Sequence, residues 1–433
     1  MKRIWISLVS LATVAAVLLT GCGGSSKPTA SSPSTSAPEQ KTAAAKVSLT
    51  YWTPLTGGDG DFMKAMVDKF NSSQDKIFVE INTSVWENYY TKLTTAMGAG
   101  EAPDVAIIHM ANLPMFTTKN ALLPLDDLAT KAGFDANDFA AIPWKGSVAD
   151  GKRVAIPLDV HPLIWFYNQD TFEKAGLIKD GRPQVPTSWA ELMTELKTIK
   201  DKTGKNPMSV QEAGWTGYRE WFSYLYQNGG QLLTDDMKKA AFNSPAGIAA
   251  LKAQMQIVDN NYTPHGLNSD TLKAAWLAGD IGIQPNGVWN TGGYEQAGMK
   301  FFTTPLPQLF QKPAVWANSH TLTLPRNKAS NPEKQQAAIT FIKWISDNSI
   351  MWAKAGQIPA RKSVVASADF KAFTHQPTYA LNLDAVVYPP ATPKLSEVEN
   401  AIYEQLQGAY AHKSSPEDAL KAAEAKVNDI LSK

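Results

Sequence analysis

Residues 47–108 alternate between strand and helix patterns. Residues 47–52 and 77–81 are rich in β-branched and aromatic side chains, and residues 104–108 form an apolar run bounded by turn residues. Between these segments, apolar residues recur at helical spacing over residues 62–70 and 86–97. Because successive strands joined by helices pair in parallel, this order predicts an α/β fold whose sheet is covered on both faces.

The ends of these strands are where a ligand is expected. In open α/β sheets, ligands bind beyond the carboxyl ends of the strands. The loops after residue 52 and after residue 108 are therefore the first candidates for a binding site.

Strand and helix patterns continue through the rest of the chain. Strands are predicted at residues 164–167, 281–283 and 321–324. Ser188 and Glu191 predict a capping box at the start of one helix, and the last helix is predicted to begin at Ser415, with Pro416 in its first turn. The roughly 390 residues of the body exceed one core of ordinary size, so we expect two lobes.

The N-terminal residues predict export and attachment to a membrane. Lys2 and Arg3 precede an apolar run over residues 4–19 that is too short for a membrane span, so residues 1–21 are predicted to be a signal peptide. The run ends in small residues before Cys22, the only cysteine, and this arrangement resembles the bacterial lipobox. We expect an acyl anchor on Cys22, at the extracytoplasmic face of the bacterial cell membrane. The alternative is an ordinary secreted protein with a free cysteine.

Residues 22–46 consist mainly of Ser, Thr, Ala, Pro and Gly. A segment with almost no large apolar side chain cannot bury enough surface to fold, so it is predicted to be a disordered tether. Without Lys2 and Arg3 the chain carries 39 basic and 40 acidic residues, and its lysines alternate with acids along helices. This balance gives no basic stripe for a nucleic-acid partner.

Six short motifs resemble those of one family of binding proteins. In chain order they are Gly-Glu-Ala-Pro-Asp-Val at 100–105, Ile-Pro-Leu-Asp at 156–159, Phe-Tyr-Asn-Gln-Asp-Thr-Phe-Glu-Lys-Ala-Gly-Leu at 166–177, Pro-Thr-Ser-Trp-Ala-Glu-Leu at 186–192, Ala-Gly-Asp-Ile-Gly-Ile-Gln-Pro-Asn-Gly-Val-Trp at 278–289, and Gly-Gln-Ile-Pro-Ala-Arg at 356–361. Their order and spacing resemble the extracellular solute-binding protein family 1, a carbohydrate-binding group that serves ABC importers. The resemblance covers nearly the whole body of the chain.

The resemblance implies a periplasmic-binding-protein-like α/β fold of type II, in which two α/β lobes close on a sugar in the cleft between them. Carried over by position, residues 47–158 and 319–365 form the N-terminal lobe, and residues 159–318 and 366–433 form the C-terminal lobe. The chain would cross between lobes near residues 157–162 and 317–321. Polar residues on these crossings form the floor of the cleft, which makes Asp159, His161, Asn318 and His320 candidate contacts. Many members of the family have a carboxylate where this chain has His161.

A sugar site needs flat aromatic faces for the apolar side of a pyranose and planar polar groups for its hydroxyls. Trp289 follows an Asn-Gly-Val segment and matches the family's stacking tryptophan, although it could instead pack in the core of one lobe. Trp215 and Arg219, in an aromatic cluster, and Trp316, just before the second crossing, are further candidates. Tryptophans in apolar helical stripes are predicted to pack in the core: Trp189, Trp276, Trp344 and Trp352.

Two loops at strand ends supply polar candidates. Gly58 and Asp59 lie in a glycine-rich turn after the first strand, where the backbone can approach a ligand, but Asp59 could equally cap the following helix. His109 follows the strand at 104–108, and Asn112 lies one turn further along. A lone histidine can also be structural, so both roles stay open for His109.

The predicted function is capture of a mono- or oligosaccharide and its delivery to the transmembrane permease subunits of an ABC importer. A secreted carbohydrate-active enzyme is the main alternative, with Asp59 and Asp159 as its two carboxylates. Against an enzyme, the sequence has no GxSxG or HExxH motif, and its six histidines are scattered singly. A third possibility is the same fold with a polyamine, metal or peptide as solute. We expect a monomer with no catalytic residue, no cofactor and no bound metal.

Overall fold

Two mixed β-sheets organise the computed structural model, which describes residues 46–381 and 383–433. The predicted signal peptide, Cys22 and almost all of the predicted tether lie outside these residues. No helix in the described ranges combines the length and apolar composition needed to cross a membrane.

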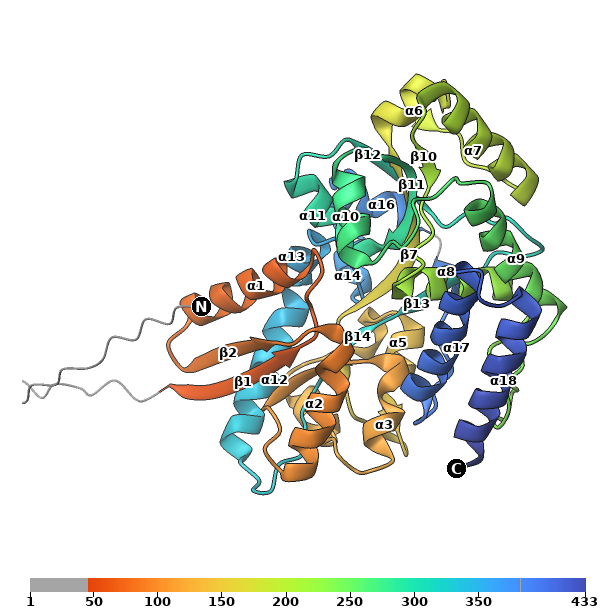
Figure 1. The fold of residues 1–433 in the computed structure, drawn as a ribbon. Helices are drawn as coiled ribbons and strands as arrows, with labels where there is room; N and C mark the ends of the chain where they lie inside the picture. The colour runs from red at the N-terminus through yellow and green to blue at the C-terminus, as the bar shows by residue number, and fades with distance from the viewer. Residues whose placement is uncertain (1–45, 382) are drawn as a thin grey trace, which may run out of the picture. The chain divides into compact units, whose positions relative to one another are not determined.

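The first sheet has five strands in the order β2-β1-β3-β14-β6. Figure 1 labels β1, β2 and β14 of this sheet. They are β1 (Val47–Thr53), β2 (Ile77–Thr83), β3 (Val105–His109), β6 (Ile156–Pro157) and β14 (His320–Thr323). β1 pairs in parallel with β2 and with β3, whereas β14 runs antiparallel to β3 and to β6. The three strands predicted over residues 47–108, and their parallel pairing, are confirmed.

Helices cover both faces of this sheet, as its strand pattern predicts. α1 (Gly60–Ser73) and α12 (Pro332–Asp347) pack on one face against alternate side chains of β1, β2 and β3. α2 (Trp86–Ala99), with the short η1 (Met110–Asn112) and α3 (Pro114–Thr117), packs on the other face. Because side chains alternate along a strand, Val105 and Ile107 meet the first group, and Ala106 and Ile108 meet the second.

The second sheet has seven strands and is built around one long strand, β7 (Asp159–Asn168). Its other members are β10 (Asn206–Met208), β11 (Ile281–Gly287), β12 (Phe301–Pro305), β13 (Val315–Asn318), β15 (Ile358–Pro359) and β16 (Val386–Val387). β7 pairs near its start with β13 and β15 and near its end with β11 and β12. Every residue of β7 is buried, which explains its nearly continuous apolar sequence.

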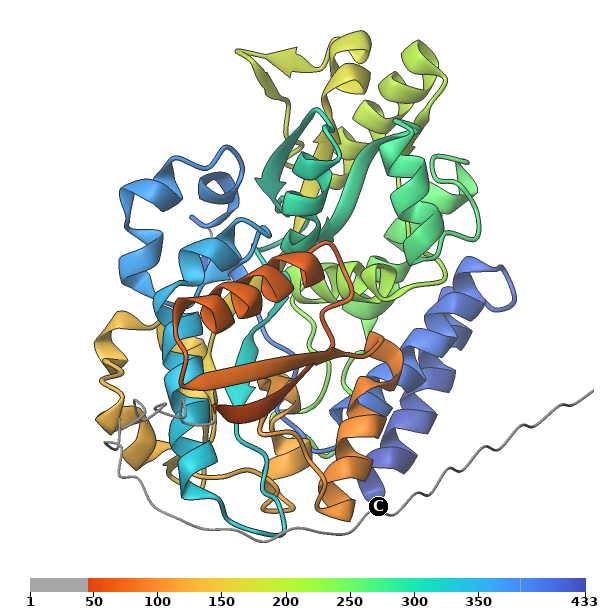
Figure 2. The same ribbon diagram turned by 90° about the vertical axis from the view of Figure 1, so that its left-hand side faces the viewer.

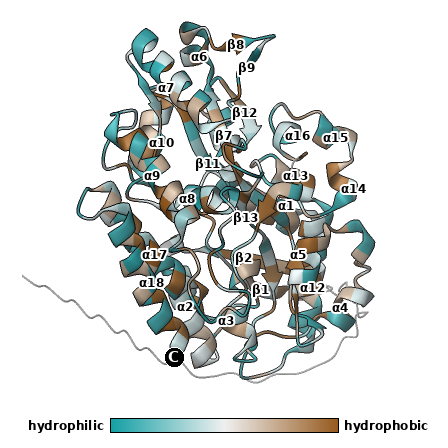
Figure 3. Cartoon of the chain, turned by 90° about the vertical axis from the view of Figure 1, so that its right-hand side faces the viewer, coloured by the Kyte–Doolittle hydropathy of each residue, from teal (hydrophilic) through white to brown (hydrophobic). Residues whose placement is uncertain are grey.

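The helices around the second sheet form the larger part of the core. They are α6 (Gln169–Ala175), α7 (Trp189–Thr203), α8 (Trp215–Gln227), α9 (Pro245–Asp259), α10 (Ser269–Leu277), α11 (Thr291–Gln296), α17 (Leu395–Tyr410) and α18 (Pro416–Ser432). α17 and α18 lie side by side in both Figure 1 and Figure 2. Both carry hydrophilic and hydrophobic residues, as expected for helices with one buried face (Figure 3).

Smaller elements complete the body. They are α4 (Asp126–Lys131), α5 (Ala141–Gly146), α13 (Ser349–Ala353), α14 (Lys362–Val365), α15 (Ala368–Lys371), α16 (Gln376–Tyr379), the hairpin strands β4 (Val148–Ala149) with β5 (Lys152–Arg153) and β8 (Ile178–Lys179) with β9 (Arg182–Pro183), and the 3-10 turns η2 (Ala136–Asp138), η3 (Val288–Asn290) and η4 (Leu383–Ala385).

The predicted helix starts are confirmed, with one difference in chemistry. Ser415 caps α18 by accepting a hydrogen bond from the backbone of Asp418. Ser188 caps α7 by accepting one from the backbone of Glu191, but the Glu191 carboxylate accepts from Thr187 instead of from Ser188. In the capping box expected here, the Glu191 side chain would accept from the backbone nitrogen of Ser188. It accepts instead from that of Thr187, one residue earlier.

Candidate ligand-binding cleft

A cavity of about 500 Å³ lies where the ends of strands from both sheets meet. Its walls come from the loop after β1, the end of β3, the starts of β7 and β14, the starts of α2, α8 and α10, and the end of β11 with the segment after it. The residues around it are Pro54, Leu55, Thr56, Gly57, Gly58, Asp59, Val85, Trp86, His109, His161, Gln211, Trp215, Thr216, Arg219, Ser269, Asp270, Lys273, Asn286, Trp289, Asn290, Tyr294, Trp316 and His320.

A second cavity of about 750 Å³ adjoins the first. The two share Trp86, His109, Trp215, Arg219 and Trp316, together with the start of α10. The second cavity continues between α2, α8 and α17. The two cavities therefore form one extended cleft with aromatic side chains at its middle.

Trp289 and Trp316 form an aromatic corner in this cleft. Their ring centroids are 6.3 Å apart and their planes meet at 87°. The guanidinium of Arg219 lies 4.6 Å from the ring centroid of Trp316 and 5.2 Å from that of Trp289, within the range of cation–π attraction. The corner thus combines two indole faces with a fixed positive charge.

Two glycines allow this corner to form. A Cβ atom at Gly287 would lie 2.0 Å from the indole ring of Trp289, so only glycine lets this ring fold back against the end of β11. A Cβ atom at Gly58 would lie 3.0 Å from the carbonyl oxygen of Trp289 and 3.5 Å from the Cα of Gly293. The loop after β1 therefore sits in direct contact with the segment after β11, which comes from the other sheet.

Asp59 faces the cavity from the loop after β1. Asp59 occupies the N-cap position of α1, as the helix-cap alternative expects, but its side chain makes no cap hydrogen bond to the helix. The carboxylate instead accepts a hydrogen bond of 3.0 Å from Nε2 of Gln357. Burial raises the pKa of Asp59 to about 6, so at neutral pH it is mainly an ionised acceptor.

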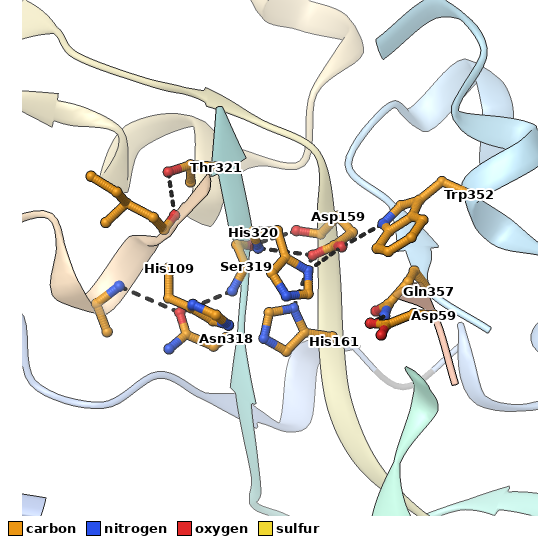
Figure 4. A network of polar contacts seen from close by, with 12 residues as sticks. Asp59, His109, Asp159, His161, Asn318, Ser319, His320, Thr321, Trp352 and Gln357 are labelled. Atoms are coloured by element: carbon orange, nitrogen blue, oxygen red, sulfur yellow. Dashed lines mark hydrogen bonds and ion pairs between the residues drawn. The ribbon is translucent and has the colours of Figure 1, made fainter. Parts of the chain in front are cut away.

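Three histidines line the cavity and form its floor, and Figure 4 shows their side chains close together beside Asp159. His109 ends β3 and His320 begins β14, and the two are direct cross-strand partners. His161 lies on β7, where it pairs with Asn318 of β13. The ring centroids of the three imidazoles are 4.1 to 5.3 Å apart.

Asp159 lies beneath two of these histidines. One carboxylate oxygen is 2.9 Å from Nδ1 of His161, and the other is 2.7 Å from Nδ1 of His320. The carboxylate also accepts hydrogen bonds from the backbone nitrogen of His320 and from Nε1 of Trp352. Burial opposes ionisation of Asp159, but His320 and His161 together hold the pKa of this carboxyl well below its usual range.

The same burial sets the protonation of the histidines. Burial and the neighbouring His320 lower the pKa of His161 to about 4, and burial lowers the pKa of His109 well below its ordinary value. For His320, burial works against protonation, but Asp159 raises its pKa above the ordinary value. At neutral pH, His109 and His161 are therefore neutral.

Most of the residues predicted from sequence come together in this cleft. The 500 Å³ cavity is lined by Gly58, Asp59, His109, His161, Trp215, Arg219, Trp289, Trp316 and His320. Asn112 and Asn318 line only the adjoining cavity. Asp159 lines neither cavity, because the rings of His161 and His320 occupy its two oxygens.

Sequence reasoning missed several residues of the cleft. Trp86 lies 4.6 Å from His109 between ring centroids and lines both cavities, and Tyr90 bonds Nδ1 of His109 through its hydroxyl. Their helical spacing favoured core packing. The signal that would have identified Trp86 is its position just after the carboxyl end of β2, which is equivalent to that of Asp59 after β1.

Comparison with known proteins gives the family. A family model for the bacterial extracellular solute-binding protein matches residues 65–378. This chain belongs to that family. The solute-binding protein is 25% identical over 399 residues to the diacetylchitobiose binding protein DasA of Streptomyces coelicolor, covering 88% of this chain and 89% of that protein.

Solved structures agree on the fold. The GacH receptor of Streptomyces glaucescens superimposes with a TM-score of 0.79 at 22% identity, covering 89% of this chain and 99% of that one. The cyclic alpha-maltosyl-1,6-maltose binding protein of Arthrobacter globiformis gives a TM-score of 0.70 at 26% identity, covering 89% and 99%. The solute-binding protein therefore has the periplasmic-binding-protein-like α/β fold that its motifs predict.

Proposed function

We propose that this solute-binding protein captures an uncharged mono- or oligosaccharide in the cleft and delivers it to the permease of an ABC importer. The observation that carries the proposal is the extended cleft, with Trp86, Trp215 and Trp316 where its two cavities join and Trp289 on the wall of the 500 Å³ cavity. Indole faces suit the apolar C–H faces of pyranose rings, and the amide, carboxylate and imidazole groups beside them suit hydroxyls. DasA and the Arthrobacter protein are both named for sugar ligands, which supports this solute class.

The cleft also offers a mechanism of capture. Its walls come from strands of both sheets, so a bound solute touches both at once. We propose that residues 47–158 with 319–365 and residues 159–318 with 366–433 act as two lobes that hinge near residues 157–162 and 317–321. A solute that contacts both lobes favours the closed form, because the open form lacks half of these contacts.

The positions of the two candidate carboxyl groups favour binding over glycoside hydrolysis. A glycosidase needs two carboxyl groups that both face the substrate. Asp59 faces the cavity, but Asp159 is fully buried beneath His161 and His320 and does not line it. These two acids therefore do not form a pair across the cleft.

A ligand screen tests the sugar proposal. Mono-, di- and trisaccharides are added to the purified protein, and a sugar that binds the folded form raises its melting temperature by mass action. For the sugar so found, Trp289→Leu is expected to weaken binding by about tenfold or more, equal to about 1.4 kcal/mol, because leucine has no flat face. Trp344→Leu is the control, since Trp344 is half-buried against the first-sheet core and away from the cleft.

Two outcomes would contradict the proposal. Equal binding by Trp289→Leu and wild type would remove the tryptophan corner from the site. Release of shorter products from labelled oligosaccharides by the wild-type protein would make it an enzyme.

We propose further that Cys22 is acylated and anchors the protein outside the cytoplasm, as its lipobox-like sequence predicts. Cys22→Ser should then move the protein from the membrane fraction to the soluble fraction. It should also abolish incorporation of labelled fatty acid. Retention of label by the Cys22→Ser variant would contradict the anchor.

A further inference from the structure

The three histidines on the floor of the cleft have the composition and closeness of a metal site. One ring nitrogen of each of His109, His161 and His320 lies within 4.8 Å of the corresponding nitrogens of the other two. They come from three separate strands, β3, β7 and β14. Backbone pairing of β3 with β14 fixes two of them, so strand register and not a flexible loop holds the group together.

In each of these histidines Nδ1 is engaged in a polar contact, which leaves Nε2 as the nitrogen that can bind a metal. Nδ1 of His161 and of His320 are both held by Asp159, and Nδ1 of His109 lies 2.8 Å from the hydroxyl of Tyr90. With Nδ1 engaged in each ring, Nε2 is the nitrogen left to face the cavity that all three histidines line. A carboxylate on Nδ1 fixes the tautomer that leaves the Nε2 lone pair free, which is the usual outer partner of a metal-binding histidine.

Tyr90 can serve His109 in the same way. Its oxygen already accepts a hydrogen bond from the backbone nitrogen of His109. The same oxygen has a second lone pair for Nδ1–H, and its own hydrogen can turn into the adjoining cavity, which Tyr90 lines. All three rings can therefore adopt the tautomer with Nε2 free.

The spacing suits a tetrahedral ion after a small contraction. Zn–N bonds of about 2.0–2.1 Å place neighbouring ligand nitrogens about 3.4 Å apart in a tetrahedron. One ring nitrogen from each histidine lies within 4.8 Å of the others, which exceeds this tetrahedral spacing by at most about 1.4 Å. Closing this gap requires small rotations of the rings about their side-chain bonds.

We propose that the protein binds one divalent transition-metal ion of the Zn²⁺ type through Nε2 of His109, His161 and His320, with the fourth position open to the cleft. Three imidazoles with one open position form a known zinc donor set, and imidazole suits ions of this class. Since all three histidines line the 500 Å³ cavity, water or an oxygen of the solute would complete the tetrahedron. The site goes beyond the proposed sugar function, which needs no metal.

Metal titration of the purified protein tests the site. The protein is prepared without a histidine tag, stripped with EDTA and titrated with Zn²⁺ by calorimetry and with Co²⁺ by visible absorption. We expect one equivalent of Zn²⁺ and the visible bands of four-coordinate Co²⁺. His161→Gln or His109→Gln should abolish both signals, and Asp159→Asn should weaken Zn²⁺ binding by roughly 10–100-fold, the usual effect of losing an outer partner.

Controls separate this site from adventitious binding and from unfolding. His265→Gln and His412→Gln remove histidines that lie outside the cleft, and they should bind Zn²⁺ as the wild type does. Circular dichroism checks that each variant folds. Because His109 and His161 lie on different strands, the test remains possible if one of their two variants fails to fold. Absence of saturable binding, or one-equivalent binding that survives in both folded ligand variants, would overturn the proposal. Sugar binding measured in EDTA is a separate readout, so failure of either proposal leaves the other standing.

Discussion

Replacement of Asp159 by alanine should cost more stability than almost any other single change in the cleft. The carboxylate is fully buried and accepts four hydrogen bonds, from Nδ1 of His161 at 2.9 Å, Nδ1 of His320 at 2.7 Å, the backbone nitrogen of His320 at 2.9 Å and Nε1 of Trp352 at 2.7 Å. Asp159→Ala leaves these donors without an acceptor. Each buried unpaired donor costs about 1–3 kcal/mol, and removing one partner of a buried ionic group costs about 3–5 kcal/mol in total.

We therefore expect Asp159→Ala to lower the free energy of unfolding by about 3–5 kcal/mol. The costs do not simply add, because the four donors share one acceptor group and relax together. Asp159→Asn keeps the shape but turns one acceptor oxygen into a donor that faces a histidine. Its loss should be smaller, about 1–3 kcal/mol.

Urea denaturation at neutral pH, followed by tryptophan fluorescence and circular dichroism, measures both losses. The control is Asp280→Ala, since Asp280 forms a half-exposed pair with Lys205 that is worth no more than about 1 kcal/mol. If Asp159→Ala and Asp280→Ala have the same stability, the carboxylate does not hold the floor of the cleft together and the reasoning fails.

Three further changes probe other parts of the molecule. Burial raises the pKa of Glu220 to about 7, so its proton stabilises the folded form fully below pH 4.5, and this contribution is lost as pH rises through 7. Between pH 5 and pH 8, wild type should therefore lose about 2.5 kcal/mol more stability than Glu220→Gln in urea denaturation, and parallel curves for the two proteins would contradict this. Ser415→Ala removes the N-cap of α18 and should cost about 1 kcal/mol by the same method, whereas no change would show that the cap is dispensable. Gly58→Ala should weaken sugar binding by about 1–3 kcal/mol in calorimetry, because its Cβ would crowd the carbonyl oxygen of Trp289, while Gly98→Ala, which meets nothing within 4 Å, should bind normally.

The fold was predictable because its signals are local. In residues 47–108, runs of β-branched residues predict the strands and the spacing of apolar residues predicts the helices. The structure has strands and helices at these places. Turn chemistry marked the ends of these elements, including the caps at Ser188 and Ser415. Each of these signals depends on residues within about one helical turn of each other, so one sequence is enough to identify them.

The floor of the cleft depends on the register between strands that are far apart in the chain. This register could not be predicted from the sequence. His109 and His320 are cross-strand partners although 211 positions separate them in the chain. His161 joins them only because β7 pairs with β13 at Asn318. Each histidine is single in the sequence, so the expectation that the chain has no metal site rested on a pattern that folding rearranges.

Asp159 is a residue for which the sequence predicted a ligand contact that the fold does not provide. Its position on a crossing strand predicted a ligand contact, and alternation along β7 does place it on the same face as His161. The prediction of a ligand contact took no account of the two imidazoles that lie between this carboxylate and the cavity. Its role in the structure is to orient histidines that face the cleft.

The two proposed ligands of the cleft place different demands on its walls, and one variant separates them. A sugar held between Trp289 and the loop after β1 needs these segments to close on each other, and Gly58 lies at their contact. The three histidines lie on β3, β7 and β14, and Gly58 supplies no metal ligand. Gly58→Ala should therefore weaken sugar binding while leaving the Zn²⁺ titration unchanged, and His161→Gln should abolish the Zn²⁺ signal while the Trp289 corner remains. Loss of zinc binding in Gly58→Ala would mean that the histidines assemble only when the cleft closes, and the metal site would then belong to the closed form alone.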